Sequence, residues 1–369
     1  MKPKCYSVII AGGKGTRFWP LSRSQRPKQL LKILSPKSLI RETANRIVPL
    51  SGRNQTLVVT VAEQLNALRK ELRLLARKNF LAEPQGRNTA PCIGLAALEV
   101  VGRDPVSVMV ILPADHWITD ANAFRNTIRS AVEIAMRHDS LITIGIRPAY
   151  PETGYGYIVK GNSLGAKTGA YRVKRFREKP SVSMAQQLIH QGSLWNSGIF
   201  VWKASFLLEL MQRYQPTISK GLEQIKRATA GKPLGVPTPQ IRNLIAREYK
   251  KMPNISIDYA VLEKAGSEGK VITLEADFGW SDVGSWAAVH RMLPHDLNGN
   301  AGNGKWLTVE TKNSLIHAQG RLVVLLGMQD TVVVDTPDAL FVGNIRRSQE
   351  VRELVEELNK KGYGAYTIK

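Results

Sequence analysis

Short apolar runs and amphipathic stretches alternate along roughly the first 285 residues. Apolar runs bounded by turn signals are typical of strands, and apolar residues repeated at helical spacing are typical of helices. The predicted strands are residues 7–11, 55–61, 80–82, 106–112 and 141–146. The predicted helices are residues 62–78, 90–101 and 121–138. Because such alternation builds right-handed strand–helix–strand crossovers, we expect an α/β fold with a mostly parallel sheet and flanking helices.

The pattern changes in the last quarter of the chain. Short Val- and Leu-rich segments, separated by Gly, Asn and Asp, occupy residues 321–326, 331–334 and 339–342. A helical pattern returns at residues 348–361. These segments predict a small β-rich domain with a closing helix, either a short β-helix or a small sheet. We therefore expect a first domain over residues 1–288 and a second over residues 289–369.

The loop after the first predicted strand reads AGGKGTRFWPLSRSQRPKQLL. Ligands of open parallel sheets bind beyond the carboxyl ends of the strands. Gly12, Gly13 and Gly15 let the backbone approach a ligand closely, and their N–H groups can surround an anion. Arg17 and Lys28 would add positive charge around a polyphosphate. The loop lacks the spacing of a Walker P-loop and of the dinucleotide fingerprint, so a tight turn with a solvated basic loop is the alternative interpretation.

The charge of the chain supports an anionic ligand. The formal net charge is +22 and the pI is about 10.1. Residues 1–53 contain twelve Lys and Arg but a single acid, Glu42. Such a surface attracts nucleic acid, nucleotides or phosphorylated metabolites. Because no helix-turn-helix, zinc-finger or aromatic RNA-binding motif accompanies the charge, we expect no nucleic-acid partner.

Cysteine content and apolar runs bear on the cellular compartment. The two cysteines, Cys5 and Cys92, cannot form a disulfide framework, which favours a reducing compartment. The apolar run at residues 8–11 is shorter than a signal-peptide core, and no run approaches the ~20 residues that cross a bilayer. We therefore expect a cytoplasmic protein with no membrane partner.

Residues 12–29, GGKGTRFWPLSRSQRPKQ, resemble the signature of sugar-1-phosphate nucleotidylyltransferases, and the WPLSR and PKQ details are similar to mannose-1-phosphate guanylyltransferases. Phe18 stands where these enzymes usually have Leu. The resemblance implies a Rossmann-like sheet of the nucleotide-diphospho-sugar transferase type. It also implies transfer of GMP from GTP to α-D-mannose 1-phosphate, giving GDP-mannose and diphosphate, by Mg²⁺-dependent in-line attack without a covalent intermediate.

The resemblance places a second loop, EPQGRNTAP at residues 83–91, against the guanine. A Glu83 carboxylate can accept hydrogen bonds from guanine N1–H and N2–H₂, and Arg87 and Asn88 would line the base or ribose. A turn in which Asn88 and Thr89 cap the next helix is the structural alternative. The predicted nucleotide site comprises Ala11, Gly12, Gly13, Gly15, Thr16, Arg17, Lys28, Glu83, Arg87, Asn88, Pro113, Ala114 and Asp115.

Two further loops carry carboxylates suited to Mg²⁺. Asp115 lies in LPADH, directly after the most apolar predicted strand, and Asp282 lies in FGWSDVGSW. Mg²⁺ prefers oxygen ligands, and the resemblance implies that both aspartates bind it. A helix cap is the competing interpretation of Asp115.

The motifs TGYGYI, FREKP, WNSGIF and SIDYAVLEK resemble the sugar-phosphate half of the site. Arg177 departs from the usual F-V-E-K-P pattern. The predicted sugar-phosphate ligands are Gly154, Glu178, Lys179, Asn196 and Asp258. The predicted catalytic residues are Arg17, Lys28 and Lys179, whose charges would stabilise the reacting phosphates.

Alternatives remain open on the sequence alone. A nucleotidylyltransferase for another pair, such as dTTP with glucose 1-phosphate or GTP with a heptose phosphate, would share most of these motifs. A nucleic-acid-binding protein and a catalytically silent regulatory subunit are alternatives of other classes. Some relatives carry a fused isomerase domain; the C-terminal part of this chain offers His295 and His317, and we expect no isomerase activity. A homodimer is compatible with the sequence, which does not decide the oligomeric state.

Overall fold

The computed structural model describes residues 4–13, 15–165, 168–229 and 232–368. By its internal contacts the chain divides into two compact units. Unit 1 comprises Met1–Gly12, Thr43–Ala114 and Ile118–Trp280, and unit 2 comprises Gly13–Glu42, Asp115–Trp117 and Ser281–Lys369. The sequence-based boundary after residue 288 stays a prediction. No helix in the described part of the chain is long and apolar enough to cross a membrane.

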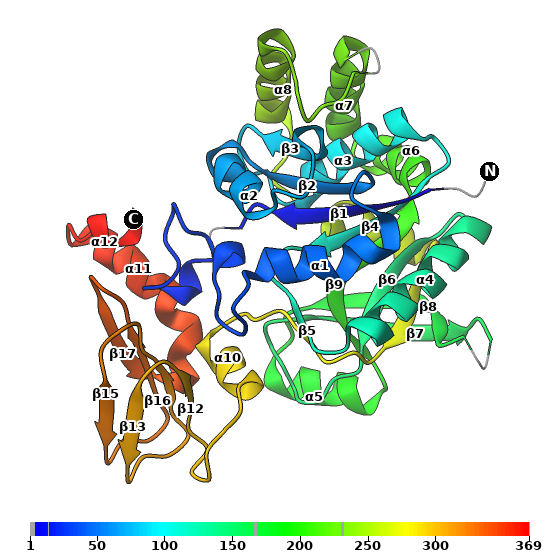
Figure 1. Ribbon diagram of the computed structural model, residues 1–369. Coiled ribbons are helices and arrows are strands. Elements are labelled where there is room, and N and C mark those ends of the chain that lie inside the picture. The colour runs from blue at the N-terminus through cyan, green and yellow to red at the C-terminus, as the bar shows by residue number, and fades with distance from the viewer. Residues whose placement is uncertain (1–3, 14, 166–167, 230–231, 369) are drawn as a thin grey trace. The chain divides into compact units, whose positions relative to one another are not determined.

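Unit 1 is built on one mixed sheet, which has nine strands within the described residues, in the order β3-β2-β1-β4-β9-β6-β10-β8-β7 (Figure 1). Its strands are β1 (Cys5–Ala11), β2 (Thr56–Val61), β3 (Phe80–Glu83), β4 (Val108–Pro113), β6 (Leu141–Ile146), β7 (Gly156–Ser163), β8 (Ala170–Glu178), β9 (Leu194–Lys203) and β10 (Val271–Ala276). The first four are mutually parallel, as the alternating pattern predicts. Beyond them the sheet becomes mixed, because β9 pairs antiparallel with both β4 and β6.

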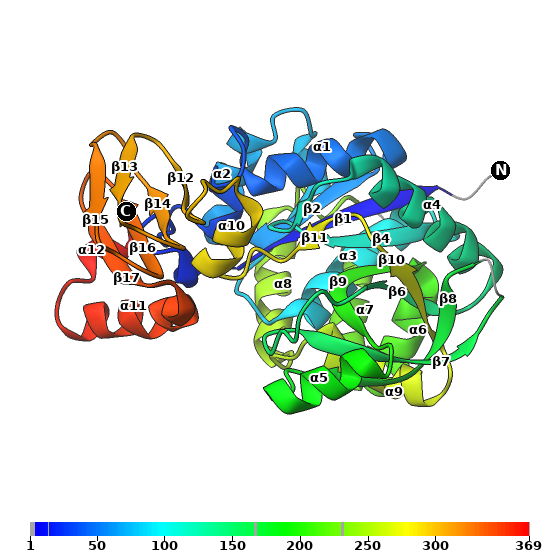
Figure 2. The same cartoon turned by 90° about the horizontal axis from the view of Figure 1, so that it is seen from below.

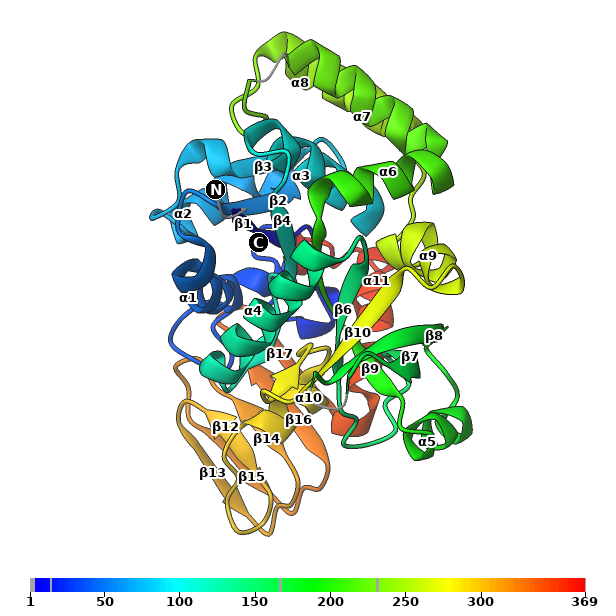
Figure 3. The same cartoon turned by 90° about the vertical axis from the view of Figure 1, so that its right-hand side faces the viewer.

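Helices lie on both faces of this sheet. They are α1 (Leu39–Ser51), α2 (Leu65–Glu71), α3 (Thr89–Arg103), α4 (Ala121–Arg137), α5 (Val182–His190), α6 (Ala204–Tyr214), α7 (Pro216–Thr229), α8 (Pro239–Lys251) and α9 (Glu263–Ser267). Helix α3 packs on β1, β2 and β4 and also on α6 and α7, and α7 and α8 form a side-by-side pair (Figure 3). Helix α4 packs against β4, β6, β9 and β10.

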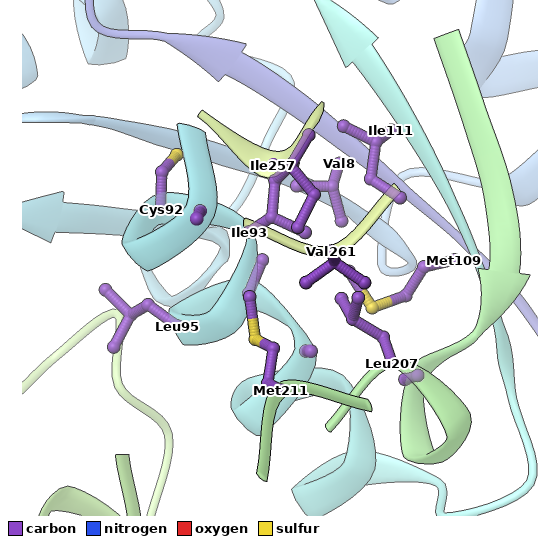
Figure 4. Packing of buried hydrophobic residues seen from close by; sticks show 14 of the residues in the cluster. Val8, Cys92, Ile93, Leu95, Met109, Ile111, Leu207, Met211, Ile257 and Val261 are labelled. Carbon is purple, nitrogen blue, oxygen red and sulfur yellow. The ribbon is translucent and has the colours of Figure 1, made fainter. Parts of the chain in front are cut away.

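The core of unit 1 fills the space between the sheet and α3. Ile93 and Leu95 of α3, Met109 of β4, and Leu207 and Met211 of α6 all belong to this core (Figure 4). All five side chains are almost completely buried. Burial of such aliphatic side chains is worth roughly 1.5–3 kcal/mol each, which keeps the strand ends rigid.

The predicted helix over residues 62–78 is wrong beyond its middle. Helix α2 ends at Glu71, and Leu72 leaves helical geometry with φ −109° and ψ 52°. Leu72 and Leu75 are nevertheless buried. Because both leucines still face inward after the turn, their spacing imitates a continuing helix.

Unit 2 contains a short β-helix (Figure 2). Strands β12 (Ala301–Asn303), β14 (Leu315–His317) and β16 (Thr331–Asp335) stack in parallel on one side, and β13 (Trp306–Val309) and β15 (Val323–Leu326) stack in parallel on the other. Strand β17 (Leu340–Asn344) closes the first sheet antiparallel to β16. The sequence left a short β-helix and a small sheet as alternatives, and the stacked parallel strands show that the domain is a β-helix.

Three helices and the glycine-rich segment complete unit 2. The helices are α10 (Trp286–Met292), α11 (Val351–Lys360) and α12 (Ala365–Ile368). Phe18 packs edge-on against Trp286, with ring centroids 5.0 Å apart, and both belong to the core that contains Leu315, Val332 and Val355. The segment that follows β1 therefore shares its core with residues about 300 positions later.

One face of the β-helix is aliphatic and exposed. Leu307 and Val309 of β13 lie in register with Val324 and Leu326 of β15, and all four are 44–70% exposed. Adjacent in-register side chains on one face form a continuous patch. With the flanking Leu322 the patch covers several hundred Å², at the upper end of what a monomer exposes.

Candidate active site

Six of the predicted phosphate and metal residues meet in unit 2. Strands β1 and β4 are neighbours in the sheet, and the chain passes from unit 1 to unit 2 directly after each of them, at Gly13 and at Asp115. It enters unit 2 a third time at Ser281. Three motifs far apart in sequence therefore supply one cavity of about 660 Å³ within unit 2. The predicted residues that line it are Gly15, Thr16, Arg17, Lys28, Asp115 and Asp282.

Gly15 determines the path of the phosphate loop. Its φ of 65° and ψ of 36° are left-handed, and a Cβ built on it would lie 2.2 Å from the Cβ of Lys28. Only glycine fits both demands. A 3-10 turn over Thr16–Phe18 follows and carries Arg17 on its exposed side. Gly13 is also exposed, and Lys14 lies outside the described residues.

Lys28 is buried at the base of the cavity. Its Nζ lies 2.7 Å from Asp115 Oδ2 and donates a hydrogen bond of 2.7 Å to the backbone oxygen of Asp282. The ammonium also lies over the Phe18 ring, 5.6 Å from its centroid. Lys28 is therefore a positive charge held between the two acidic motifs.

Asp115 is ionised at neutral pH. Burial alone would raise the pKa of its carboxyl, but the charges of Lys28 and His116, together with hydrogen bonds from Lys28 and the backbone, hold that pKa below its ordinary value. The side chain is one-third exposed, on the wall of the cavity. An ionised carboxylate at this position can bind a cation.

Asp282 lines the same cavity, in the DVG turn. Val283 has a left-handed φ of 48°, and its N–H donates to Ser281 Oγ at 3.1 Å. A Cβ on Gly284 would lie 2.7 Å from Asp282 Oδ2, so the glycine makes room for the carboxylate. Asp115 and Asp282 thus offer hard oxygen donors in one cavity, which fits Mg²⁺. The described residues contain no cluster of three or more His, Cys, Asp or Glu that could hold a metal.

The predicted base-binding residues lie in unit 1, at the end of β3. Glu83 is 3% exposed, and its Oε1 has no hydrogen-bond partner among the described residues. Burial raises the pKa of Glu83 to about 8, although hydrogen bonds with Cys92 and Tyr249 oppose the shift. A Cβ on Gly12 would lie 3.8 Å from Glu83 Oε2, so the backbone of Gly12 passes close to the carboxyl group.

The remaining residues of this loop have structural partners. Asn88 has a left-handed φ of 61° and caps α3, since its side chain accepts a hydrogen bond of 2.9 Å from Thr89 N–H. The capping role weighed for Asn88 is therefore observed. Arg87 is half-buried and donates to the backbone oxygen of Lys250 at 3.1 Å. Pro113 ends β4 beside Ile10 of β1, which continues to Ala11. The N–H of Ala114, the next residue, donates to Ile10 oxygen at 2.9 Å.

The predicted sugar residues also lie in unit 1, and two of them are in contact. Asn196 Nδ2 donates to Asp258 Oδ1 at 3.0 Å, and Thr143 Oγ1 donates to Asn196 Oδ1 at 3.0 Å. Burial raises the pKa of Asp258 to about 6, and the nearby Glu178 charge adds to the shift. Asp258 begins a π-helical turn, a local widening of the helix that is frequent at functional sites.

Lys179 and Gly154 complete the predicted sugar set. Lys179 has a left-handed φ of 43°, and its Nζ lies 3.8 Å from Glu178 Oε1. Gly154 N–H donates to Glu152 Oε1 at 2.9 Å. Gly156 was not predicted as a site residue, yet a Cβ on it would lie 2.6 Å from Glu178 Oε2. Gly156 lies in the TGYGYI motif, and this was the sequence feature that could have identified it as a site residue.

Sequence reasoning missed two groups. An aromatic cluster of unit 1 joins Tyr155, Trp195 and Trp280, with neighbouring centroids 5.2–6.4 Å apart. Further lining of the unit 2 cavity comes from the signature loop and the C-terminal helices, through Ser22, Arg23, Ser24, Arg352, Val355, Glu356, Asn359 and Thr367. The C-terminal residues carried no usable signal, because their pattern is that of an ordinary solvated helix.

The first strand of this α/β unit ends in a glycine-rich basic loop, and acidic residues follow later strands. This arrangement is typical of a nucleotide-binding transferase. The chain belongs to the nucleotidyl transferase family: the model "Nucleotidyl transferase" matches residues 6–299, and "MannoseP isomerase/GMP-like beta-helix domain" matches residues 304–358. The family and fold class expected from the sequence are thereby confirmed.

Named relatives extend over most of the chain. It is 36% identical to a mannose-1-phosphate guanylyltransferase of Escherichia coli (strain K12), covering 97% of this chain and 74% of the relative. It is 38% identical to the xanthan biosynthesis protein XanB of Xanthomonas campestris pv. campestris (strain B100), covering 96% and 73%. A crystal structure described as mannose-1-phosphate geranyltransferase from Thermus thermophilus is similar with a TM-score of 0.85 and 32% identity, over 96% of this chain and 99% of that one.

Proposed function

We propose that the protein transfers GMP from GTP to α-D-mannose 1-phosphate, giving GDP-mannose and diphosphate. The observation that carries the proposal is the cavity of unit 2, which gathers Arg17, Lys28, Asp115 and Asp282 from three separate motifs. Cations and carboxylates side by side suit a polyphosphate that binds together with a metal ion. The guanylyltransferase names among relatives 36–38% identical to this chain support the choice of substrates.

The reaction requires positioning and charge stabilisation rather than a covalent intermediate. A phosphate oxygen of the sugar phosphate attacks the α-phosphorus in line, and diphosphate leaves. Arg17 would stabilise the β- and γ-phosphates, Lys28 the α-phosphate or the leaving group, and Lys179 the phosphate of the nucleophile. Asp115 and Asp282 would hold Mg²⁺, which screens the repulsion between the two anions.

Specificity would come from the residues of unit 1. We assign guanine to Glu83, whose unpartnered buried oxygen suits the two adjacent donors of that base. Arg87 and Asn88 would line the base or ribose, and Ala11, Gly12, Gly13, Pro113 and Ala114 would contribute backbone at the ends of β1 and β4. The sugar would contact Gly154, Glu178, Asn196 and Asp258.

We also propose a cytoplasmic homodimer. Cys5 and Cys92 are both free thiols, as a reducing compartment favours. The aliphatic face of β13 and β15 carries no charged side chain, and a second copy is the occupant that fits it. Twofold dimers are the commonest assemblies, and an exposed apolar face is typical of such an interface.

Diphosphate release tests the function. Purified protein with Mg²⁺ is offered each of GTP, ATP, UTP and dTTP with mannose 1-phosphate, glucose 1-phosphate or a heptose phosphate. We expect the highest kcat/KM for GTP with mannose 1-phosphate. Preference for dTTP would contradict the guanine assignment, and salt-sensitive DNA binding without turnover would favour the nucleic-acid alternative.

Two substitutions test the mechanism. We expect Arg17→Ala and Asp115→Ala each to lower kcat/KM by roughly 10²-fold or more, the effect of losing a positioned charge. Arg346→Ala is the control, because Arg346 is exposed and pairs with Asp330 at 2.8 Å on the β-helix. Near-wild-type kinetics would remove the substituted residue from the mechanism.

An isomerase is the second candidate, because a structure described as a mannose-6-phosphate isomerase from Helicobacter pylori is similar with a TM-score of 0.60 and 28% identity, over 75% of this chain. We still expect none of this activity. Interconversion of mannose 6-phosphate and fructose 6-phosphate by the pure protein would contradict that expectation.

A further inference from the structure

The cavity of unit 2 extends beyond the motifs that the reaction uses. Part of its lining, which we call the C-terminal wall, comes from α11 and the residues after it, together with Ser22, Arg23 and Ser24 of the signature loop. We infer that this wall is a subsite for terminal phosphates, in which Arg352 binds the γ-phosphate of GTP and, in the reverse direction, diphosphate. The identity of the nucleotide as GTP rests on the proposed function, whereas the binding of diphosphate by Arg352 does not.

The wall is built into the fold, since C-terminal residues hold the signature loop. Ser24 N–H donates to Thr367 oxygen at 3.1 Å, and Gln25 N–H donates to Ile368 oxygen at 3.0 Å. Trp19 Nε1 donates to Tyr366 oxygen at 2.9 Å. These bonds form a clasp between the signature loop and residues 366–368.

Arg23 strengthens the clasp. Its side chain is 4% exposed, and its guanidinium pairs with Asp338 at 2.9 Å and also donates to the backbone oxygen of Tyr366. Its Nε donates to Pro20 oxygen at 2.7 Å. Because its donors are engaged by protein acceptors, Arg23 positions the loop rather than binding ligand.

Arg352 is differently placed. Helix α11 turns Val351 and Val355 into the core, and Arg352 lies on the cavity wall one turn before Glu356. Its Nε lies 3.3 Å from Glu356 Oε1, and both side chains are more than half exposed. An exposed pair of this kind contributes less than about 1 kcal/mol. A phosphate, which an arginine can bind through two parallel hydrogen bonds, therefore competes readily for this guanidinium.

A buried hydroxyl supports a polar ligand at this wall. Ser22 is 3% exposed and lines the cavity, and its Oγ has no hydrogen-bond partner in the described part of the chain. A buried hydroxyl without a partner is costly, and a phosphate oxygen would satisfy it. Asn359 and Thr367 are joined by a hydrogen bond of 2.9 Å and add polar atoms to the same wall.

Charge favours the same assignment. The carboxylates of the cavity are Asp115, Asp282 and Glu356. Arg23 and Lys28 are buried and paired with aspartates, whereas Arg352 pairs with the exposed Glu356. Arg17 and Arg352 are therefore the arginines of the cavity best placed to meet a ligand. A terminal diphosphate carries two phosphate groups, and two arginines on one cavity match it.

Binding of inorganic diphosphate tests the subsite without turnover. Isothermal titration calorimetry of the full chain with Mg²⁺ and diphosphate should show affinity at least tenfold weaker for Arg352→Ala than for wild type, with partial recovery in Arg352→Lys. The matched control is Arg347→Ala, since Arg347 is equally exposed and pairs with Glu350. Wild-type affinity in Arg352→Ala would overturn the proposal.

Kinetics of the reverse reaction separate binding from a structural effect. Arg352→Ala should raise the KM for diphosphate at least tenfold while the KM for GDP-mannose and the melting temperature stay unchanged. Equal increases in both KM values would overturn the subsite. A chain that does not use GTP would contradict the proposed function, whereas the calorimetric comparison would still decide whether Arg352 binds diphosphate.

Discussion

Backbone geometry at single residues marks three of the predicted site motifs. Among the described residues other than glycine, six have left-handed φ angles, and Asn88, Lys179 and Val283 are three of them. Such conformations cost on the order of 1–3 kcal/mol and persist only where the surroundings enforce them. Val283 is the most unusual, because a β-branched side chain rarely adopts this region. The other three, Glu310, Asn313 and Asp330, lie in turns of the β-helix.

Gly15→Ala should disable the phosphate site without unfolding the protein. The new methyl group would overlap Lys28 Cβ, so Lys28 would shift away from Asp115. We expect kcat/KM to fall by at least ~10-fold, since positioned charges supply much of the rate enhancement. Gly102→Ala is the control, because nothing lies within 4 Å of its added Cβ. Wild-type kinetics for Gly15→Ala would contradict this account of the loop.

GTP binding should release a proton from Glu83. With a pKa of about 8 the carboxyl group is protonated at pH 7, whereas two guanine donors require the carboxylate. We expect GTP affinity to rise with pH up to about 8, with a buffer-dependent binding enthalpy in calorimetry. Glu83→Gln should abolish both effects, and a pH-independent wild type would argue against the assignment.

Stability offers a second measurement of Glu83. Since its folded-state pKa lies above the ordinary value of 4.5, the folded protein loses stability as pH rises from about 4.5 through 8. The loss is about 1.4 kcal/mol per unit of pKa difference. Urea unfolding of Glu83→Gln should lack this component of the pH dependence.

At the scale of elements, some of the fold could be predicted and some could not. Strands β1, β4 and β6 lie within two residues of their predicted bounds. Their short, almost continuously apolar runs are typical of parallel strands that are buried on both faces. The direction of β9 could not be read from its apolar pattern, which is the same for parallel and antiparallel pairing. The π-helical turn at Asp258 likewise left no sequence signal.

That turn leads to a pH prediction for the sugar site. Asp258 has a pKa of about 6, so its carboxylate is lost as pH falls below that value. We expect the KM for mannose 1-phosphate to rise severalfold between pH 7 and 5.5 in wild type. Asp258→Asn should retain only the titration of the substrate phosphate, so the ratio of the two KM values isolates the carboxyl group. A ratio that does not change with pH would exclude this role.

At the scale of the whole molecule, the motif residues of the site could be predicted from the sequence, but the C-terminal residues that line the same cavity could not. Motifs identified Arg17, Lys28, Asp115 and Asp282, and the structure gathers them in one cavity. No pattern along the chain indicated that residues 13–42 pack with residues 281–369 in one unit. Arg352 stayed hidden for that reason, since an exposed arginine on an amphipathic helix looks the same whether it faces solvent or ligand.

The oligomeric state tests the aliphatic face of the β-helix. We expect wild type to sediment at micromolar concentration as a dimer of 40.9 kDa chains, and Leu326→Asp to sediment as a monomer, because a charge would be buried in an apolar interface. Leu297→Asp is the control, since Leu297 is a fully exposed leucine outside these strands. A monomeric wild type would contradict the dimer.

The clasp on the signature loop has a consequence for biosynthesis. Residues 19–25 leave the ribosome early, whereas their partners Asp338, Tyr366 and Thr367 are made more than 300 residues later. Domains generally fold in order of synthesis, at roughly 5–20 residues per second. For tens of seconds a nascent chain can therefore have a folded sheet but no finished phosphate loop. The cavity that we propose as the polyphosphate site is then completed only when translation is nearly finished.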